Sequence, residues 1–140
     1  HIDIFMDNGY SKEEMKMVNE TKKIMTRPDM KISATAVRVP VYHGHSESVY
    51  IETNKDTSLA EIKQSLSQGQ GIILYDDLKN NKYPMPKLVE DTDQVLVGRL
   101  RKDLDQDNGY HLWVVANNLR KGAATNAVQI AEELTKRGLL

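Results

Sequence analysis

Arg38 and His45 are the first residues whose types and spacing suggest a chemical role. Arg38 follows two alanines at alternate positions, so on an extended chain its guanidinium has room to bind a carboxylate through two parallel hydrogen bonds. The alternative is a solvated arginine on an edge strand. His45 follows Gly44 in an expected turn, where an imidazole can act as a general acid and base near neutral pH. His43 makes a metal pair conceivable, but no third ligand has a clear spacing, so we expect no metal site.

Two further groups of polar residues lie near expected helix starts. Glu13 and Lys16 are three positions apart on one helix face, which suits either a surface ion pair or an ammonium group that meets an anion. Residues 117–124, Asn-Asn-Leu-Arg-Lys-Gly-Ala-Ala, span the expected start of the final helix. N-capping explains the asparagines, but cations oppose the positive end of the helix dipole. The small residues that follow would let a ligand or another backbone approach, so a binding role also fits.

The elements that must position these residues follow from capping and periodicity. Capping boxes at Ser11–Glu14 and Ser58–Glu61 predict two helix starts. Asn108-Gly109 predicts a hairpin. The expected helices are 12–25, 59–67 and 120–137, and the expected strands are 31–42, 48–53, 72–75, 95–101 and 110–115, with a mostly irregular segment at 76–93. This order predicts an α+β fold with a largely antiparallel mixed sheet and flanking helices.

Composition excludes several classes of protein. The chain has 140 residues, enough for about one domain, and its formal net charge is -1, which provides no field to attract nucleic acid or an anionic membrane. It has no cysteine, so it carries no disulfide, no thiolate metal site and no cysteine nucleophile. No run of residues has the length and apolar character of a membrane-spanning helix. The first residue is His1, which suggests a fragment of a longer chain.

Several segments resemble, in order and over nearly the whole chain, the bacterial aspartate-semialdehyde dehydrogenase family. The strongest are Arg38-Val39-Pro40-Val41 and His45-Ser46-Glu47-Ser48-Val49, which are similar to the arginine and histidine motifs of that family. The supporting segments are residues 13–24, residues 97–103, Arg120-Lys121-Gly122-Ala123-Ala124 and Asn126-Ala127-Val128-Gln129. The resemblance implies the family's C-terminal half, with a fold like the C-terminal domain of glyceraldehyde-3-phosphate dehydrogenase.

The resemblance also implies an activity and a role for each site residue. The family reduces L-aspartyl 4-phosphate to L-aspartate 4-semialdehyde with NADP as cofactor, a step towards lysine, methionine and threonine. His45 matches the catalytic histidine, and Arg38 the arginine that binds the substrate carboxylate. Glu13 matches the carboxylate that meets the substrate amino group, and Lys16 the cation that holds the phosphate. Asn118 lies where the family contacts the nicotinamide end of the cofactor.

The family's cysteine and glycine-rich dinucleotide motif are missing from the chain. We therefore expect residues 1–117 to be a substrate-binding and dimerisation domain, and residues 118–140 to be a helix that packs on an absent nucleotide-binding domain, which would bind most of the NADP. We also expect a cytoplasmic homodimer whose chain is inactive alone, with no nucleic-acid or membrane partner. The alternative is a stand-alone binding or scaffolding module with the same fold and no catalysis.

Overall fold

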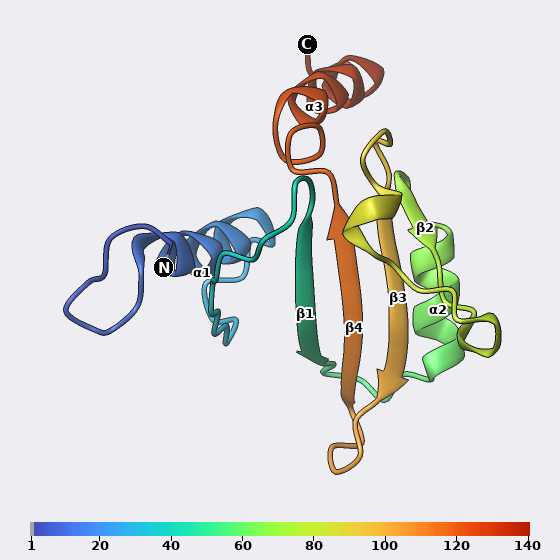
Figure 1. The fold of residues 1–140 in the computed structure, drawn as a ribbon. Coiled ribbons are helices and arrows are strands. Elements are labelled where there is room, and N and C mark those ends of the chain that lie inside the picture. Colours follow the sequence, from blue (N-terminus) through green and yellow to red (C-terminus); the bar gives the residue numbers. More distant parts are fainter. Residues whose placement is uncertain (1) are drawn as a thin grey trace. The chain divides into compact units, whose positions relative to one another are not determined.

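The structure, a computed structural model, describes residues 2–140 and shows an α+β fold, as predicted (Figure 1). This described part contains three α-helices, one four-stranded sheet and two short 3-10 helices, Leu78–Asn80 and Pro86–Leu88. The chain divides into two compact units, one comprising the first 40 residues and the other Val41–Leu140. The elements are α1 (Lys12–Ile24), β1 (His45–Glu52), α2 (Leu59–Ser67), β2 (Ile72–Leu74), β3 (Val95–Lys102), β4 (Gly109–Ala116) and α3 (Ala124–Lys136).

In the first unit, α1 begins where the capping box predicts. The Ser11 hydroxyl accepts the Glu14 backbone N–H, and the Glu14 carboxylate accepts the Ser11 backbone N–H in return. Two donors that a helix start would otherwise leave unpaired are thereby satisfied. Val18 is the buried apolar residue of the helix. The predicted helix over residues 12–25 is confirmed to within one residue.

The predicted strand over residues 31–42 is wrong. Among residues 2–140 no strand forms over this segment, although its burial alternates between half-buried Ala34 and Ala36 and exposed Val37 and Val39. Alternation shows that a chain is extended, but a strand also requires a neighbouring backbone to pair its N–H and C=O groups. Here the Ala36 N–H donates to a side chain, the Glu14 carboxylate, instead.

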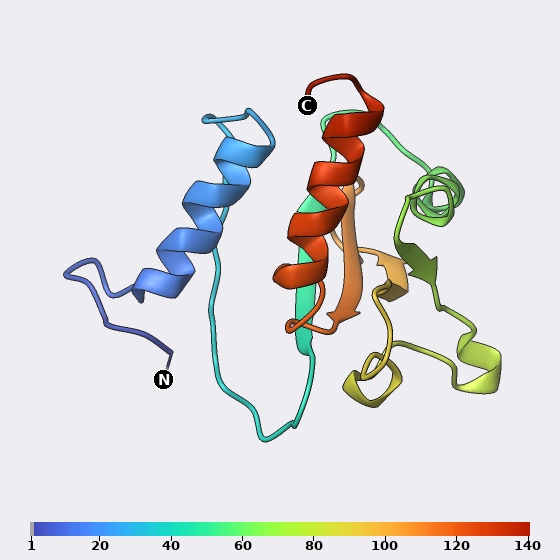
Figure 2. The same cartoon turned by 90° about the horizontal axis from the view of Figure 1, so that it is seen from above.

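The second unit is built on a sheet in the order β1-β4-β3-β2. The β1–β4 and β3–β4 pairs are antiparallel and the β2–β3 pair is parallel, which confirms the predicted mixed sheet. The predicted hairpin joins β3 to β4. Helix α2 starts at its predicted Ser58 cap and packs against β2 and β3 at one edge of the sheet, as Figure 2 shows. Val89, Leu96 and Val115 form a buried cluster with Trp113 against it.

Two boundaries in this unit differ from prediction. Strand β1 begins at His45, three residues earlier than expected, so His45 is a strand residue and the turn lies before it. Helix α3 begins at Ala124 rather than Arg120, because Gly122 adopts φ +87°, which interrupts a right-handed helix. Its N-cap, Ala123, makes no side-chain capping bond. The expected clash of basic residues with the helix dipole therefore does not arise, since Arg120 precedes the helix and bonds to Asp93 at 2.5 and 3.0 Å.

No helix among residues 2–140 combines the length and the apolar character needed to cross a bilayer.

Candidate functional site

In the first unit, Glu13 and Lys16 form the predicted pair on the first turns of α1. The Lys16 ammonium lies 3.5 Å from a Glu13 carboxylate oxygen, and the side chains are 55% and 34% exposed, respectively. A solvated pair of this kind contributes roughly 0–1 kcal/mol to stability. Both charged groups are therefore accessible and weakly committed to each other, as a ligand-binding role would require.

Glu14 links this helix start to the segment that carries Arg38. One Glu14 carboxylate oxygen accepts the Ser11 N–H at 2.8 Å and the other accepts the Ala36 N–H at 2.9 Å. Donation from Ala36, and then from Ser11, lowers the pKa of Glu14 below its usual value. Arg38 lies two residues beyond this anchor. Within residues 2–140 the exposed Arg38 side chain has no hydrogen-bond or ion-pair partner, so its guanidinium is available.

From the sequence, the capping box accounts for Glu14 only as a helix-cap residue. Its bond to Ala36 spans 22 positions, and no local pattern indicates a contact at that separation. An anchor between the helix start and the arginine segment was therefore missed.

In the second unit, His45 is exposed and stands opposite Ala116 at the end of the β1–β4 ladder. The start of β1 and the end of β4 meet at the top of the sheet in Figure 1. The preceding Gly44 is buried and has φ +87°. A Cβ at this position would lie 3.1 Å from Val89 Cγ2, so glycine suits both the conformation and the space.

Asn118 lies at the same end of the sheet. Its Oδ1 accepts the Gly44 N–H at 3.2 Å, between residues 74 positions apart. The structure thus brings the predicted cofactor residue to the turn that directly precedes the predicted acid–base residue, His45. Asn118 Nδ2 makes no hydrogen bond within residues 2–140, and an amide donor of this kind fits the oxygen of a nicotinamide carboxamide.

The structure does not bring all of the predicted site residues together in one unit. Glu13, Lys16 and Arg38 belong to the first unit, and His45 and Asn118 to the second.

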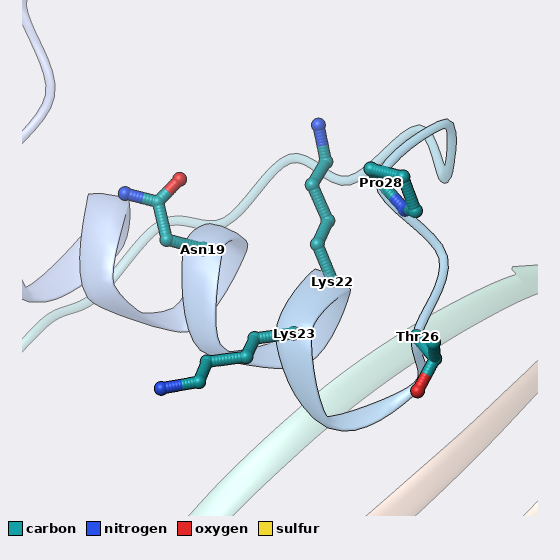
Figure 3. A pocket seen from close by; sticks show the side chains of 5 residues that line it. All are labelled: Asn19, Lys22, Lys23, Thr26 and Pro28. Carbon is teal, nitrogen blue, oxygen red and sulfur yellow. The ribbon is translucent and has the colours of Figure 1, made fainter.

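A hollow in the first unit lies elsewhere, at the end of α1 (Figure 3). It has a volume of about 390 Å³ and is lined by Asn19, Lys22, Lys23, Thr26 and Pro28. Figure 3 shows the two lysine side chains extending in different directions, so they do not converge on one ligand position. Among residues 2–140 there is also no group of three or more His, Asp or Glu side chains arranged to hold a metal ion.

Comparisons with known proteins identify the relatives of this chain. Residues 1–121 match the family described as semialdehyde dehydrogenase, dimerisation domain. The aspartate-semialdehyde dehydrogenase of Aquifex aeolicus is 54% identical over 140 residues, and that of Bacillus subtilis is 56% identical over 140 residues. These alignments cover 100% and 99% of this chain but 41% and 40% of the relatives. The chain thus spans about two fifths of the length of these curated relatives.

Solved structures give the same result. Aspartate-semialdehyde dehydrogenase II of Vibrio cholerae, crystallised with ASA, superposes with a TM-score of 0.90 at 49% identity, over 97% of this chain and 40% of that one. The Candida albicans enzyme, crystallised with NADP, gives a TM-score of 0.73 at 29% identity, over 94% of this chain and 44% of that one. With the family match over residues 1–121, these similarities show that the chain belongs to the semialdehyde dehydrogenase dimerisation-domain family.

Proposed function

We propose that this chain is the substrate-binding and dimerisation part of an NADP-dependent aspartate-semialdehyde dehydrogenase. The observation that carries the proposal is identity above 50% to two such enzymes over essentially the whole chain, with the predicted polar residues accessible. The complete enzyme would convert L-aspartyl 4-phosphate, NADPH and a proton into L-aspartate 4-semialdehyde, NADP and phosphate. Its place is in amino-acid biosynthesis in the cytoplasm, and its assembly is a homodimer formed through this domain.

In this proposal the residues of the second unit handle protons and the cofactor. His45, exposed at the start of β1, acts as the general acid and base of the acyl-transfer steps. Asn118 would hold the nicotinamide end of the cofactor by donating its Nδ2–H to the carboxamide oxygen. The cofactor, when bound, supplies the hydride. The nucleophilic cysteine comes from the rest of the enzyme, because this chain has none.

The residues of the first unit bind the substrate. The planar guanidinium of Arg38 donates two parallel hydrogen bonds to the α-carboxylate, a geometry for which it is better suited than an ammonium group. Glu13 meets the substrate amino group and Lys16 the phosphate. The exposed Glu13–Lys16 pair separates readily for these contacts, since its net stability is small.

The test is phosphate-dependent formation of NADPH from aspartate semialdehyde. We expect turnover from the full-length protein that contains this chain and none from residues 1–140 alone. Turnover by the 140-residue chain would contradict the assignment of the nucleophile to another part of the enzyme. No turnover by the full-length protein would contradict the proposed function and favour a binding or scaffolding module.

A single substitution tests the proposed substrate-binding role of Arg38. Arg38→Lys keeps the charge but loses the planar fork, so we expect kcat/KM for the aspartyl substrate to fall by roughly tenfold or more. Glu20→Gln, which changes an exposed charge elsewhere on α1, is the control and should leave kcat/KM unchanged. Unchanged kinetics in Arg38→Lys would exclude Arg38 as the residue that binds the carboxylate.

A further inference from the structure

Three chain segments converge where β1 begins and β4 ends. The first is the turn at Gly44, the second contains Val89 and Glu90, and the third leaves β4 at Ala116. Gly44 packs so closely that an added Cβ would lie 3.1 Å from Val89 Cγ2 and 3.4 Å from the Ala116 carbonyl oxygen. Val89 is itself fully buried. The residue before His45 thus has little freedom to move while the other two segments stay in place.

Asn117 joins two of these segments. It is 3% exposed, and its Nδ2 donates to the Glu90 carbonyl oxygen at 2.7 Å while its Oδ1 accepts the Leu119 N–H at 3.0 Å. Its own carbonyl oxygen accepts N–H groups from Arg120 at 3.1 Å and from Lys121 at 2.8 Å. These bonds determine the direction in which the chain leaves β4, and therefore the place of the next residue, Asn118.

Asn118 connects the third segment to the first. Its Oδ1 accepts the Gly44 N–H at 3.2 Å, and Gly44 is directly bonded to His45. Two hydrogen bonds, linked through the peptide bond between Asn117 and Asn118, thus connect the Glu90 carbonyl oxygen to the Gly44 N–H, directly before His45. His45 makes no side-chain hydrogen bond within residues 2–140, so its position depends on its backbone.

We propose that Asn117 and Asn118 are positioning residues for His45. Asn118 acts through Gly44, and Asn117 acts by holding Asn118. The inference rests on the proposed function, in which His45 is the general acid and base. In this arrangement the Asn118 amide oxygen binds the protein backbone, and Asn117 supports the site rather than capping a helix or binding a ligand directly.

The first test measures hydrogen exchange of the Gly44 amide by NMR in the 140-residue chain. Asn118→Ala removes the acceptor, and we expect Gly44 to exchange at least about tenfold faster. Asn118→Asp keeps an oxygen acceptor and should preserve the slow exchange. Asn117→Asp loses the donor to Glu90 and should also speed exchange at Gly44.

The matched control is Asn108→Asp at the opposite end of the sheet. Asn108 Nδ2 donates to the Thr53 carbonyl oxygen at 2.7 Å, the same kind of bond that Asn117 makes to Glu90. This variant should leave Gly44 exchange unchanged. If Asn108→Asp accelerates Gly44 as much as Asn117→Asp does, the effect is general loosening and the proposal is overturned. Unchanged Gly44 exchange in both Asn117→Asp and Asn118→Ala would overturn it as well.

The second test uses the full-length enzyme. Asn117→Asp should lower kcat by roughly tenfold with the KM for aspartate semialdehyde within about twofold, because a displaced acid–base group slows the chemical step more than it weakens substrate binding. Asn108→Asp should change neither constant. A rise in KM with unchanged kcat would contradict positioning of His45. Absence of turnover in the wild-type protein would overturn the proposed function instead, and the Gly44 exchange would still decide whether the asparagines hold this turn.

Discussion

The two ends of the β1–β4 ladder each carry a histidine, and the structure uses the two histidines in opposite ways. His45 opens β1 at one end, opposite Ala116. His111 lies near the other end, opposite Tyr50 and next to the β3–β4 hairpin. In Figure 1 the first end is at the top of the sheet and the hairpin is at the bottom.

At the hairpin end, the His111 side chain takes part in the contacts that stabilise the turn. His111 Nε2 lies 2.6 Å from Asp103 Oδ2, and its ring is 5.0 Å from the ring of Tyr50. Asp103 also accepts backbone N–H groups from Asp105 at 2.9 Å and Gln106 at 3.0 Å. His111 and the turn thus share one carboxylate, and the imidazole is occupied by a structural contact.

At the other end, Asn117 and Asn118 hold the backbone, and the His45 side chain stays accessible. Asn118 bonds to the backbone of Gly44, and the His45 ring has no hydrogen-bond partner within residues 2–140. An acid–base catalyst needs an imidazole that can meet the substrate in a fixed place. A histidine whose backbone is fixed and whose side chain is accessible, like His45, suits catalysis. A histidine whose side chain is hydrogen-bonded within the fold, like His111, suits stability.

The largest expected effect separates the two histidines by activity. In the full-length enzyme, His45→Gln should lower kcat/KM by about 10²–10⁴-fold, the usual contribution of a general acid–base group. His111→Gln should stay within about twofold of wild type and instead lower the melting temperature. Steady-state kinetics and thermal unfolding of both variants check this. A loss of activity confined to His111→Gln would reverse the comparison.

The two ends also differ in how far local sequence signals reveal them. The hairpin end was predicted because its signal, Asn108-Gly109, lies within the turn itself, and the capping boxes that started α1 and α2 are equally local. The end that carries His45 depends on the hydrogen bond between Gly44 and Asn118, which are 74 positions apart. No periodicity indicates such a contact, so the sequence pattern leaves capping and ligand binding as alternatives for Asn117 and Asn118 and does not predict that they hold the Gly44 turn.

The same reason explains the other differences. The 31–42 segment has the alternation of a strand, but its pairing depends on which backbone lies beside it, and alternation does not specify a neighbour. The helix-forming residues before α3 are interrupted by the conformation of Gly122. The site residues follow from the family resemblance, because the pattern alone favours solvated surface positions for Arg38 and His45.

A smaller effect comes from the glycine at each end. Gly44→Ala adds a Cβ at φ +87° and 3.1 Å from Val89 Cγ2, whereas Gly109→Ala places a Cβ 2.8 Å from the Tyr50 hydroxyl and 2.9 Å from Asp103 Cβ. Each should lose about 1–3 kcal/mol of unfolding free energy in a denaturant titration. Only Gly44→Ala should also lower kcat/KM of the full-length enzyme, since it moves the backbone before His45.

Gly122→Ala is the control for this pair. Gly122 has the same φ of +87° as Gly44, but an added Cβ would meet nothing within 4 Å. Its loss of stability therefore measures the backbone conformation alone, and the excess loss in Gly44→Ala measures the contact with Val89. Equal losses in the two variants would mean that the Gly44 turn is loosely packed, which would weaken the comparison.

The smallest effect is a pH dependence confined to the hairpin end. Backbone donation from Asp105, followed by the bond to His111 and donation from Gln106, lowers the pKa of Asp103 from 3.8 to about 2. Because the pKa is lower in the folded state, Asp103 contributes its stability fully above about pH 4, and the contribution disappears as the pH falls towards 2.

Asp103→Asn should therefore lower the melting temperature at neutral pH. Its plot of melting temperature against pH should approach that of the wild type between pH 4 and 2. Other carboxylates with lowered pKa values, such as Glu14 and Asp93, also make the melting temperature fall at acidic pH, and they do so equally in the wild type and in Asp103→Asn. The difference in melting temperature between the two proteins therefore reports Asp103 alone. A scan of His45→Gln over the same range should run parallel to the wild type, because the His45 side chain fastens nothing within residues 2–140. If the melting temperatures of Asp103→Asn and the wild type ran parallel over this pH range, the Asp103 carboxylate would not stabilise the hairpin. The contrast between the two ends of the β1–β4 ladder would then depend only on the end that carries His45.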